Sequence, residues 1–383
     1  HGKGCNTKLV VGTQGGNNGD LLVSESVYGA NAYSSSKGRS VLEMWSGSIG
    51  FVLPKTFINV IGDSVRSTGD STIPVLNIQE RLSYEGNVYG AGFGPMAQVG
   101  KTSVTIHGGI VRNGVFGGGE LSAVATFSDD SADPAYRYQA LNSNAKLTDT
   151  TIHYKASADP VANVTIRGGQ MAMVVGGGRG YTGFMQGECT TPGTIMGSTR
   201  VTLLGGTVRS LGDNNTLFYH ADLGGGNVYG GGLEGVVTEN TEVIIAGGNI
   251  AGRVFAGGRG YRNAMAGEYH VQDDTISCRA TVDAGGVYGN SYVRVTDTTI
   301  NTVTTSPMVT CGVYGGGEGM NYHWAAKNRK DTVAIVYGNA RVALKGGTIG
   351  GNVYGCNNAA GAPTDDVEVK FPINVAIQIY FIA

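Results

Sequence analysis

Short runs in which apolar and polar residues alternate recur along most of this chain. The clearest one extends from Val342 to Cys356 and reads Val-Ala-Leu-Lys-Gly-Gly-Thr-Ile-Gly-Gly-Asn-Val-Tyr-Gly-Cys. A period of two predicts a β-strand with one buried face. Paired glycines suit corners where φ becomes positive or where backbones crowd together. The segment therefore predicts three short strands joined by glycine corners.

Two parts of this segment have copies elsewhere in the chain. A strand that ends in Gly-Gly occurs at 104–109, 164–169, 201–206, 243–248 and 342–347. A valine followed by an aromatic or aliphatic residue and then a small one occurs at Val27-Tyr28, Val88-Tyr89, Val115-Phe116, Val174-Val175, Val228-Tyr229, Val254-Phe255, Val287-Tyr288, Val313-Tyr314 and Val353-Tyr354. The shortest spacings between these pairs are 26 and 27 residues, which we take as the length of one repeat.

One such repeat is too short to bury its apolar face alone, whereas a stack of repeats buries a continuous one. A propeller blade would need four strands in about 40–50 residues, so the short spacing favours a β-solenoid. We expect an all-β chain that forms a right-handed parallel β-helix with three short strands per coil, since parallel connections are overwhelmingly right-handed. Hydrogen bonds would then join coils about 4.8 Å apart.

The repeat divides the chain into two regions. Residues 1–82 fit it poorly and are expected to form an N-terminal cap or degenerate coils, because a solenoid end exposes an open strand edge. Residues 83–383 are expected to form the repeat β-solenoid. Long insertions interrupt this region at 121–159, 181–199, 213–223, 261–284 and 320–337. All but the third directly follow a glycine-rich segment, so we expect loop insertions on one face, where binding residues concentrate.

The composition agrees with a β-structure that turns at glycines. The chain has 383 residues, of which 65 are glycine and 9 are proline. Its apolar content of 41% allows a buried core and argues against low-complexity disorder. The net charge of -2, without a basic block, argues against nucleic acid as a partner. No apolar run is long enough to predict a membrane span.

Two glycine-rich segments carry a resemblance to a known group of proteins. Gly-Gly-Thr-Ile-Gly-Gly-Asn-Val-Tyr-Gly at 346–355 and Asn-Val-Tyr-Gly-Gly-Gly at 227–232 resemble the repeats of glycine-rich β-solenoid proteins of bacterial surfaces, which are similar in style to β-helix adhesins. The resemblance covers residues 86–363. It implies an exported protein, extracellular or on a bacterial cell surface, and it carries no catalytic residues to transfer.

Two insertions begin with the same motif, since 177–188 and 257–268 share Arg, Tyr, Met and Glu at matched positions. They are either a pair of binding loops, with tyrosines as platforms for sugar rings, or a duplicated loop that packs on itself. A third loop at 320–331 is rich in aromatic and basic residues and could anchor a glycan or a partner protein. The candidate binding residues are Arg179, Tyr181, Glu188, Arg259, Tyr261, Glu268, Tyr322 and Trp324.

The residue after each glycine triplet is charged in most copies. If these positions stack, acidic and basic side chains alternate along one face, and opposite charges on neighbouring strands stabilise the pairing. This charge ladder consists of Glu120, Arg179, Glu234, Arg259 and Glu318. One interpretation is a row of exposed ion pairs that contribute about 0.2–1 kcal/mol each. The other is a polar groove for a polysaccharide.

The sequence contains no catalytic signature and implies no cofactor, apart from the chance of a calcium site. Asp129-Asp130, Asp273-Asp274 and Asp365-Asp366 could supply oxygen ligands to calcium, but none matches a calcium-loop motif, and solvated loop carboxylates also explain them. The five cysteines show no metal-binding spacing. Cys189 and Cys278 lie in related insertions and could form a disulfide in an exported protein.

The sequence therefore predicts a non-catalytic exported surface protein, adhesin-like or structural, that binds glycan or protein through loops on one solenoid face. Two alternatives stay open. The first is a polysaccharide lyase or glycoside hydrolase on a β-helix scaffold, in which carboxylates would converge in a groove. The second is a subunit of an extracellular fibre or surface assembly that self-associates through the solenoid ends.

Overall fold

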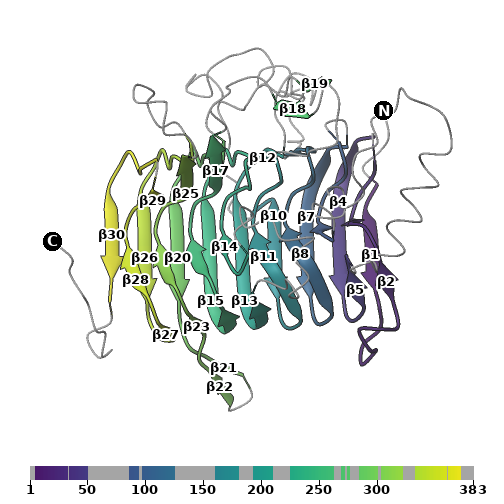
Figure 1. Cartoon of the computed structure of the whole chain (residues 1–383), viewed down its shortest axis with the longest axis horizontal. Helices are drawn as coiled ribbons and strands as arrows, with labels where there is room; N and C mark the ends of the chain where they lie inside the picture. The colour runs from purple at the N-terminus through teal and green to yellow at the C-terminus, as the bar shows by residue number, and fades with distance from the viewer. Residues whose placement is uncertain are drawn as a thin grey trace.

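The chain folds into one elongated stack of β-strands. The computed structural model describes residues 5–32, 34–50, 86–94, 97–125, 160–180, 193–209, 225–262, 269–271, 274–276, 284–300, 303–321, 333–359 and 361–371. These residues contain strands but no helix, and most of the strands belong to one large sheet that is mostly parallel. Figure 1 shows the strands side by side along the long axis, with the N-terminal strands at one end. The arrangement is compatible with a β-solenoid.

Three ladders of parallel strands carry most of the sheet. The first ladder contains β1 (Thr7–Val11), β4 (Ser36–Met44), β7 (Val99–Ile106), β10 (Ala162–Ile166), β13 (Thr199–Val208), β15 (Thr241–Ile250), β20 (Ser291–Val295), β26 (Ala340–Leu344) and β30 (Val367–Lys370). The second contains β2 (Leu22–Val23), β5 (Ser48–Ile49), the first part of β8 (Ile110–Phe116) and of β11 (Gln170–Val175), the ends of β13 and β15, β23 (Met308–Val309) and β27 (Thr348–Ile349). The third contains β3 (Val27–Tyr28), β6 (Val88–Tyr89), the ends of β8 and β11, β14 (Val228–Tyr229), β16 (Arg253–Phe255), β24 (Gly312–Tyr314) and β28 (Asn352–Tyr354).

Pairing continues at two further positions in each passage of the chain. The fourth ladder links Glu120, Arg179, Leu233, Arg259, Glu318 and Asn358, the last three within β17 (Arg259–Arg262), β25 (Glu318–Asn321) and β29 (Asn358–Ala359). The fifth links Val99, β9 (Val124–Ala125), β12 (Ile195–Met196), Val237, Val287, Val336 and Pro363. Each passage therefore has more pairing positions than the three predicted strands supply.

The interior stacks like residues on like residues. The first ladder contributes a row of fully or almost fully buried aliphatic side chains, namely Leu42, Val104, Val164, Val201, Val243, Val293 and Val342. The third ladder contributes an aromatic row in which the Tyr229 and Phe255 ring centroids are 5.2 Å apart and those of Phe255 and Tyr314 are 4.7 Å apart. Val175 interrupts the aromatic row between Phe116 and Tyr229, but it is also apolar and fully buried. Because each coil presents a buried apolar residue to its neighbours at these positions, the stack buries one continuous core.

Buried hydroxyl groups tie the first ladder to the third across the interior. Thr102, Thr199 and Thr241 each donate a hydrogen bond of 2.6 Å from Oγ1 to a backbone carbonyl that follows the third ladder. These carbonyls belong to Gly117, Gly230 and Ala256. The bonds satisfy hydroxyl groups that would otherwise be costly to bury.

The predicted glycine corners follow the first ladder and have positive φ. Gly109, Gly169, Gly206, Gly248 and Gly347 have φ between 82° and 94°. A Cβ added at Gly248 would lie 2.8 Å from the carbonyl oxygens of Gly205 and Gly206 in the preceding coil. Both the conformation and the close approach of two backbones therefore require glycine there.

The all-β class and the parallel pairing are confirmed, but one part of the predicted register is wrong. Val287 pairs with Val237 and Val336 in the fifth ladder, so Val287-Tyr288 is not a copy of the pairs in the third ladder. In the third ladder β16 pairs directly with β24, 59 residues later (Val254 with Val313). A small buried valine followed by an aromatic residue suits either ladder, since Tyr288 stacks on Tyr337 at 4.6 Å.

Two antiparallel hairpins leave the stack at different positions, and only the first lies in a predicted insertion. β18 (Tyr269–Val271) and β19 (Asp274–Ile276) follow the fourth ladder, whereas β21 (Thr298–Ile300) and β22 (Val303–Thr305) leave between the first and second ladders. Figure 1 shows the two hairpins on opposite sides of the stack. The hairpin of β21 and β22 lies outside the predicted insertions, so the chain carries an excursion that the repeat spacing does not indicate.

Candidate functional site

The residues that follow the glycine triplets stack in the fourth ladder, but they are buried rather than exposed. Glu120 and Arg179 are 3% and 2% exposed, and Arg259 and Glu318 are 3% and 7% exposed. The predicted row of solvent-exposed ion pairs is therefore wrong. Glu234 is not a member, because Leu233 occupies that rung and Glu234 follows it with a φ of 63°.

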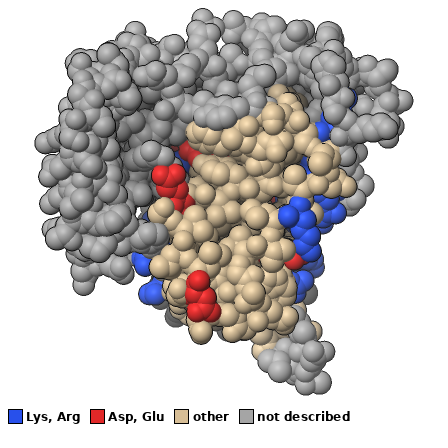
Figure 2. All heavy atoms as spheres, turned by 90° about the vertical axis from the view of Figure 1, so that its right-hand side faces the viewer, with Lys and Arg blue, Asp and Glu red and all other residues tan. Residues whose placement is uncertain are grey.

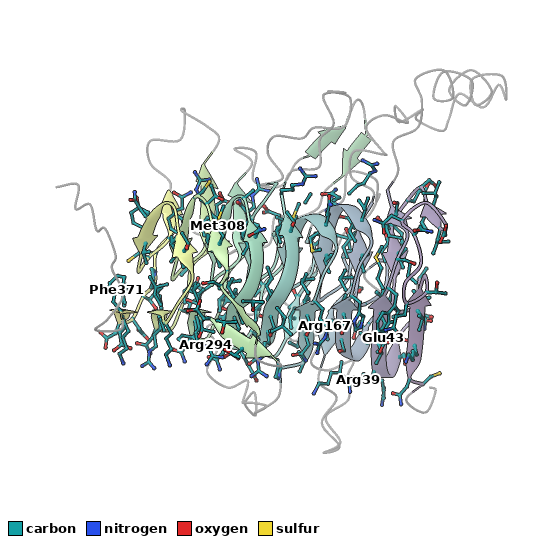
Figure 3. The ribbon with its side chains drawn as sticks, turned by 90° about the horizontal axis from the view of Figure 1, so that it is seen from below. Arg39, Glu43, Arg167, Arg294, Met308 and Phe371 are labelled. Carbon is teal, nitrogen blue, oxygen red and sulfur yellow. The ribbon has the colours of Figure 1, made fainter. Side chains whose placement is uncertain are left out.

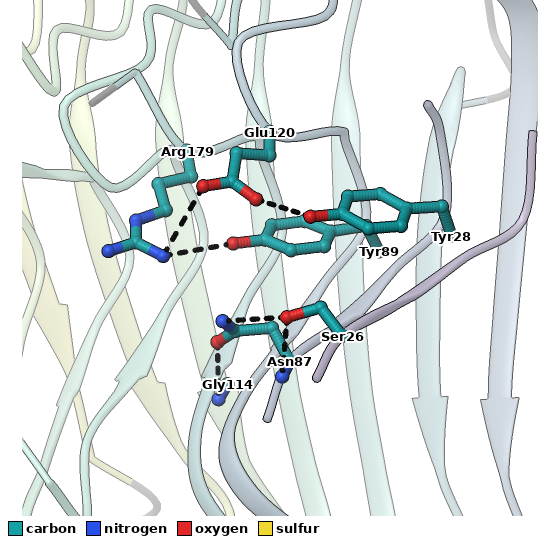
Figure 4. A network of polar contacts seen from close by, with 7 residues as sticks. All are labelled: Ser26, Tyr28, Asn87, Tyr89, Gly114, Glu120 and Arg179. Carbon is teal, nitrogen blue, oxygen red and sulfur yellow. Dashed lines mark hydrogen bonds and ion pairs between the residues drawn. The ribbon is translucent and has the colours of Figure 1, made fainter. Parts of the chain in front are cut away.

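The first buried cluster, named the Glu120 cluster, joins four successive coils (Figure 4). The Tyr28 hydroxyl donates to Glu120 Oε2 at 2.5 Å. Arg179 Nη1 lies 3.7 Å from Glu120 Oε1 and donates to the Tyr89 hydroxyl at 3.2 Å. The Tyr28 and Tyr89 rings stack with centroids 5.0 Å apart. The charged ends are thus held by the aromatic row of the preceding coils.

The second buried cluster, named the Glu318 cluster, repeats this chemistry. Tyr229 donates from its hydroxyl to Glu318 Oε2 and accepts a hydrogen bond of 2.9 Å from Asn227 Nδ2. Arg259 Nε lies 3.6 Å from the same carboxylate oxygen. Burial, and next the charge of Glu318, raises the pKa of Tyr229 well above its usual value. Tyr229 therefore stays a protonated donor to the carboxylate.

The two clusters lie on either side of Leu233 in the fourth ladder, and their acidic and basic residues follow in opposite orders. Along the ladder the residues read acid, base, apolar, base, acid, so each arginine pairs outward and Leu233 separates the two. An isolated charge inside a protein is costly, whereas a paired and hydrogen-bonded one is tolerated. This order keeps like charges off adjacent rungs. It also leaves the fourth ladder closed to solvent at these four residues.

The open polar surface lies instead on the outer face of the first ladder. Alternate residues of these strands point away from the core, and one row of them pairs rung by rung in the order Arg200, Glu242, Tyr292, Arg341 and Glu368. Arg200 Nε lies 2.6 Å from Glu242 Oε2, and Glu368 lies 3.9 Å from Arg341 Nε and 2.8 Å from Lys370 Nζ. These side chains are between 28% and 69% exposed.

An open groove of about 1180 Å³ covers this part of the face. The row from Arg200 to Glu368 lines it, together with Lys345, Lys370 and Phe371. Tyr292 lies at the centre of the row, and its hydroxyl makes no hydrogen bond to another described residue. The groove thus combines a partly exposed aromatic ring with basic and acidic side chains.

A ladder of asparagine side chains forms one rim of the groove. Asn240 Oδ1 accepts hydrogen bonds from the backbone N–H and from Nδ2 of Asn290, at 2.8 and 3.2 Å. Asn290 Oδ1 accepts the same two bonds from Asn339, at 2.9 and 3.0 Å. The bonds lock the turn before each strand, so the residues that line the groove are presented from a rigid edge.

The N-terminal half of the same face carries a stacked pair of rings. Trp45 and His107 lie with centroids 3.6 Å apart and planes 4° from parallel. Burial, and next the charge of Arg167, lowers the pKa of His107, and Glu43 partly opposes this. Figure 3 shows Arg39, Glu43, Arg167 and Arg294 along one side of the stack. Figure 2 shows an N-terminal end that is mostly uncharged in its centre, with Lys and Arg side chains at its edges and a few Asp and Glu side chains.

Most predicted loop residues lie outside the described residues. These are Tyr181, Glu188, Glu268, Tyr322, Trp324, Cys189 and Cys278, together with Asp129, Asp130 and Asp273. Of Tyr261 only the backbone is described, in β17. Asp365 and Asp366 are exposed, and Cys5, Cys311 and Cys356 are exposed free thiols.

Neither a metal site nor a membrane-spanning helix is found in the described part of the chain. No three His, Cys, Asp or Glu side chains converge there in a way that could hold a metal ion. No helix in the same residues is long and apolar enough to cross a membrane.

The groove was not predicted from the sequence. The residues that could have predicted the groove are the outward-facing ones in each strand of the first ladder. Their charges form a pattern only when the strands are aligned in the register in which they pair. Arg200, Glu242 and Arg341 occupy the second position of each strand, directly before the buried valine.

Comparisons with known proteins do not identify a family for this chain. No family model matches the chain, and neither the curated proteins nor the solved structures include a significant match. The site must therefore be interpreted from its own residues.

Proposed function

We propose that this chain is a non-catalytic, exported surface protein whose outer face on the first ladder binds a glycan or a protein. The proposal includes a right-handed parallel β-helix, because parallel crossovers are overwhelmingly right-handed. The observation that carries it is the contrast between two kinds of charged residue. Glu120 and Glu318 are buried and paired, whereas the groove side chains are open to solvent.

The spacing of carboxylates supports binding over hydrolysis. Inverting glycosidases hold their two carboxyl groups about 6.5–9.5 Å apart, and retaining ones about 5–5.5 Å apart. In the groove Glu242 and Glu368 are separated by Tyr292 and Arg341, which means three rung spacings of about 4.8 Å each, or roughly 14 Å. Each also has a cationic partner. This arrangement suits a fixed charge pattern for recognition.

We extend this proposal to the loops that follow the fourth ladder, as a second group of binding residues. Tyr181, Tyr261 and Trp324 would offer aromatic contacts to the same class of ligand. Their role is separate from that of the groove, which the strands of the first ladder and the residues directly before and after them build without these loops.

The test is a panel of purified glycans, including dextran, xylan, hyaluronate and polygalacturonate, passed over immobilised protein. We expect reversible retention of at least one glycan, with the chain length of the eluted polymer unchanged. A shortened polymer or new unsaturated ends would show a lyase or hydrolase and would overturn the proposal. If no glycan binds, the glycan half of the proposal is wrong and only a protein ligand agrees with it.

A further inference from the structure

We propose that the ligand of the groove is a linear anionic polysaccharide that runs along the stack, across successive rungs of the first ladder. This inference rests on the proposed function and specifies its ligand. Three features of the groove support it, namely its charge, its direction and the single aromatic ring within the row from Arg200 to Glu368.

The charge of the groove is positive although the chain as a whole is not. Four basic residues line it, Arg200, Arg341, Lys345 and Lys370, against Glu242 and Glu368. Glu242 forms an ion pair with Arg200. Glu368 forms an ion pair with Lys370 at 2.8 Å and a longer one with Arg341 at 3.9 Å. Lys345 and Arg341 are exposed. Since the net charge of the protein is -2, the basic surface is local to this face.

The direction of the groove follows from the pairing. Arg200, Glu242, Tyr292, Arg341 and Glu368 stand on five consecutive rungs, so polar groups repeat about every 4.8 Å along the axis of the stack. A repeating polymer can place equivalent groups on equivalent rungs, and a compact small molecule cannot. The rim amides of Asn240 and Asn290 lie beside the same rungs and suit sugar hydroxyl groups.

The single tyrosine favours a sugar polymer over single-stranded nucleic acid. Proteins that bind single strands stack successive bases on several aromatic side chains. Here Tyr292 is the one aromatic side chain within the row, and Phe371 lies at the far end of the groove. One ring between Glu242 and Arg341 suits the apolar face of one sugar ring, with the polar neighbours contacting its hydroxyl and carboxylate groups.

The test compares three polymers by isothermal titration calorimetry with the full chain. Polygalacturonate is the anionic probe, fully methyl-esterified polygalacturonate has the same backbone without the charge, and poly-glutamate has the charge without the sugar. We expect polygalacturonate to bind at least 10-fold more tightly than either of the others. Equal binding of the methyl ester would overturn the charge argument. Equal binding of poly-glutamate would overturn the assignment to a sugar and favour an acidic peptide.

Variants locate the binding. Arg341→Gln/Lys345→Gln should weaken polygalacturonate binding at least 10-fold, and Tyr292→Ala at least 5-fold. The matched control, Lys8→Gln/Arg209→Gln, also removes two exposed positive charges but outside the groove, and should change binding less than 2-fold. The far-UV spectrum of each variant checks that it is folded. Loss of binding in the control alone would overturn the proposed location.

The outcomes separate this inference from the proposed function. If polygalacturonate does not bind but dextran or xylan does, the anionic ligand is wrong and the binding function stands. If polygalacturonate binds and is cleaved, the proposed function fails.

Discussion

At the scale of single residues, the structure separates two populations of charge. Glu120, Arg179, Arg259 and Glu318 are buried beside the aromatic row. Their ion pairs are supplemented by hydrogen bonds that tyrosine hydroxyls donate to Glu120 and Glu318, and by one that Arg179 donates to a tyrosine hydroxyl. Arg200 and Glu242 form a shorter contact at 2.6 Å, yet both are partly exposed. Distance alone would rank the exposed pair as stronger. The loss of one partner should nevertheless destabilise the protein more in the buried pairs. The remaining buried charge cannot be solvated by water, whereas the remaining exposed charge can.

The first prediction concerns this difference. Glu318→Gln leaves the Arg259 charge buried and should lower the free energy of unfolding by about 3–5 kcal/mol. The matched control Glu242→Gln breaks the exposed pair and should cost less than about 1 kcal/mol. Urea unfolding followed by circular dichroism measures both.

A compensating variant sharpens this prediction. Arg259→Met/Glu318→Leu replaces the buried pair by apolar side chains and should recover most of the lost stability. Equal costs for Glu318→Gln and Glu242→Gln would contradict the account of the buried clusters.

The second prediction concerns His107. Its pKa in the folded protein is lowered by burial and by Arg167. The unfolded state then binds a proton more readily, so the neutral imidazole contributes stability above the usual pKa of about 6.5. That contribution is lost as the pH falls through the folded-state pKa.

Urea midpoints at about pH 7.5 and about pH 5 test this sign. The wild type should lose more stability on acidification than His107→Gln, which has no imidazole. A larger loss in the variant would show that His107 is stabilised as a cation by Glu43 instead.

At the scale of elements, each ladder is a row of nearly identical positions, and glycine sets where one strand can turn into the next. Gly248 has a φ of 82° and has two carbonyl oxygens within 2.8 Å of where a Cβ would lie. Gly15 has a similar φ of 77° but open space around it, and Gly19 has open space and no positive φ recorded. These three positions separate backbone strain from crowding.

The third prediction uses this series. Gly248→Ala should destabilise the most, by more than about 1 kcal/mol, because strain and steric clash add. Gly15→Ala should cost about 1 kcal/mol from the left-handed conformation alone. Gly19→Ala should be neutral or slightly stabilising. Thermal unfolding of the three variants measures the order, and equal effects of Gly248→Ala and Gly15→Ala would show that the coils do not approach so closely.

The strands and corners could be predicted because their signals are local. Alternation in Val342–Leu344 and the Gly-Gly pairs after each strand need only neighbouring residues to be interpreted. Assigning a strand to its ladder depends on contacts between coils. Val287-Tyr288 has the same local pattern as Val313-Tyr314, and only pairing with Val237 and Val336 shows that it belongs elsewhere.

The candidate site was harder to predict for a related reason. The sequence shows that Glu120 and Arg179 can stack, and an ordinary surface expectation then places them in solvent. Their burial depends on Tyr28 and Tyr89, which come from two preceding coils. Likewise the groove arises from outward residues of five separate strands, none of which stands out within its own segment.

At the scale of the whole molecule, the stack keeps its paired charges inside and presents a basic groove on one outer face. The scaffold fixes where a ligand can bind, because the rungs of the first ladder and the asparagine rim are held by backbone and amide hydrogen bonds. The central claim is that Glu120 and Glu318 belong to the scaffold, whereas Glu242 and Glu368 belong to the binding surface.

Carbodiimide labelling of carboxylates in the free folded protein, quantified by mass spectrometry, tests this claim most directly. The account predicts that Glu242 and Glu368 are labelled, because their side chains are open to solvent. Glu120 and Glu318 should stay unlabelled, because they are buried. Labelling of Glu120 and Glu318 in the folded protein, or no labelling of Glu242 and Glu368, would contradict it.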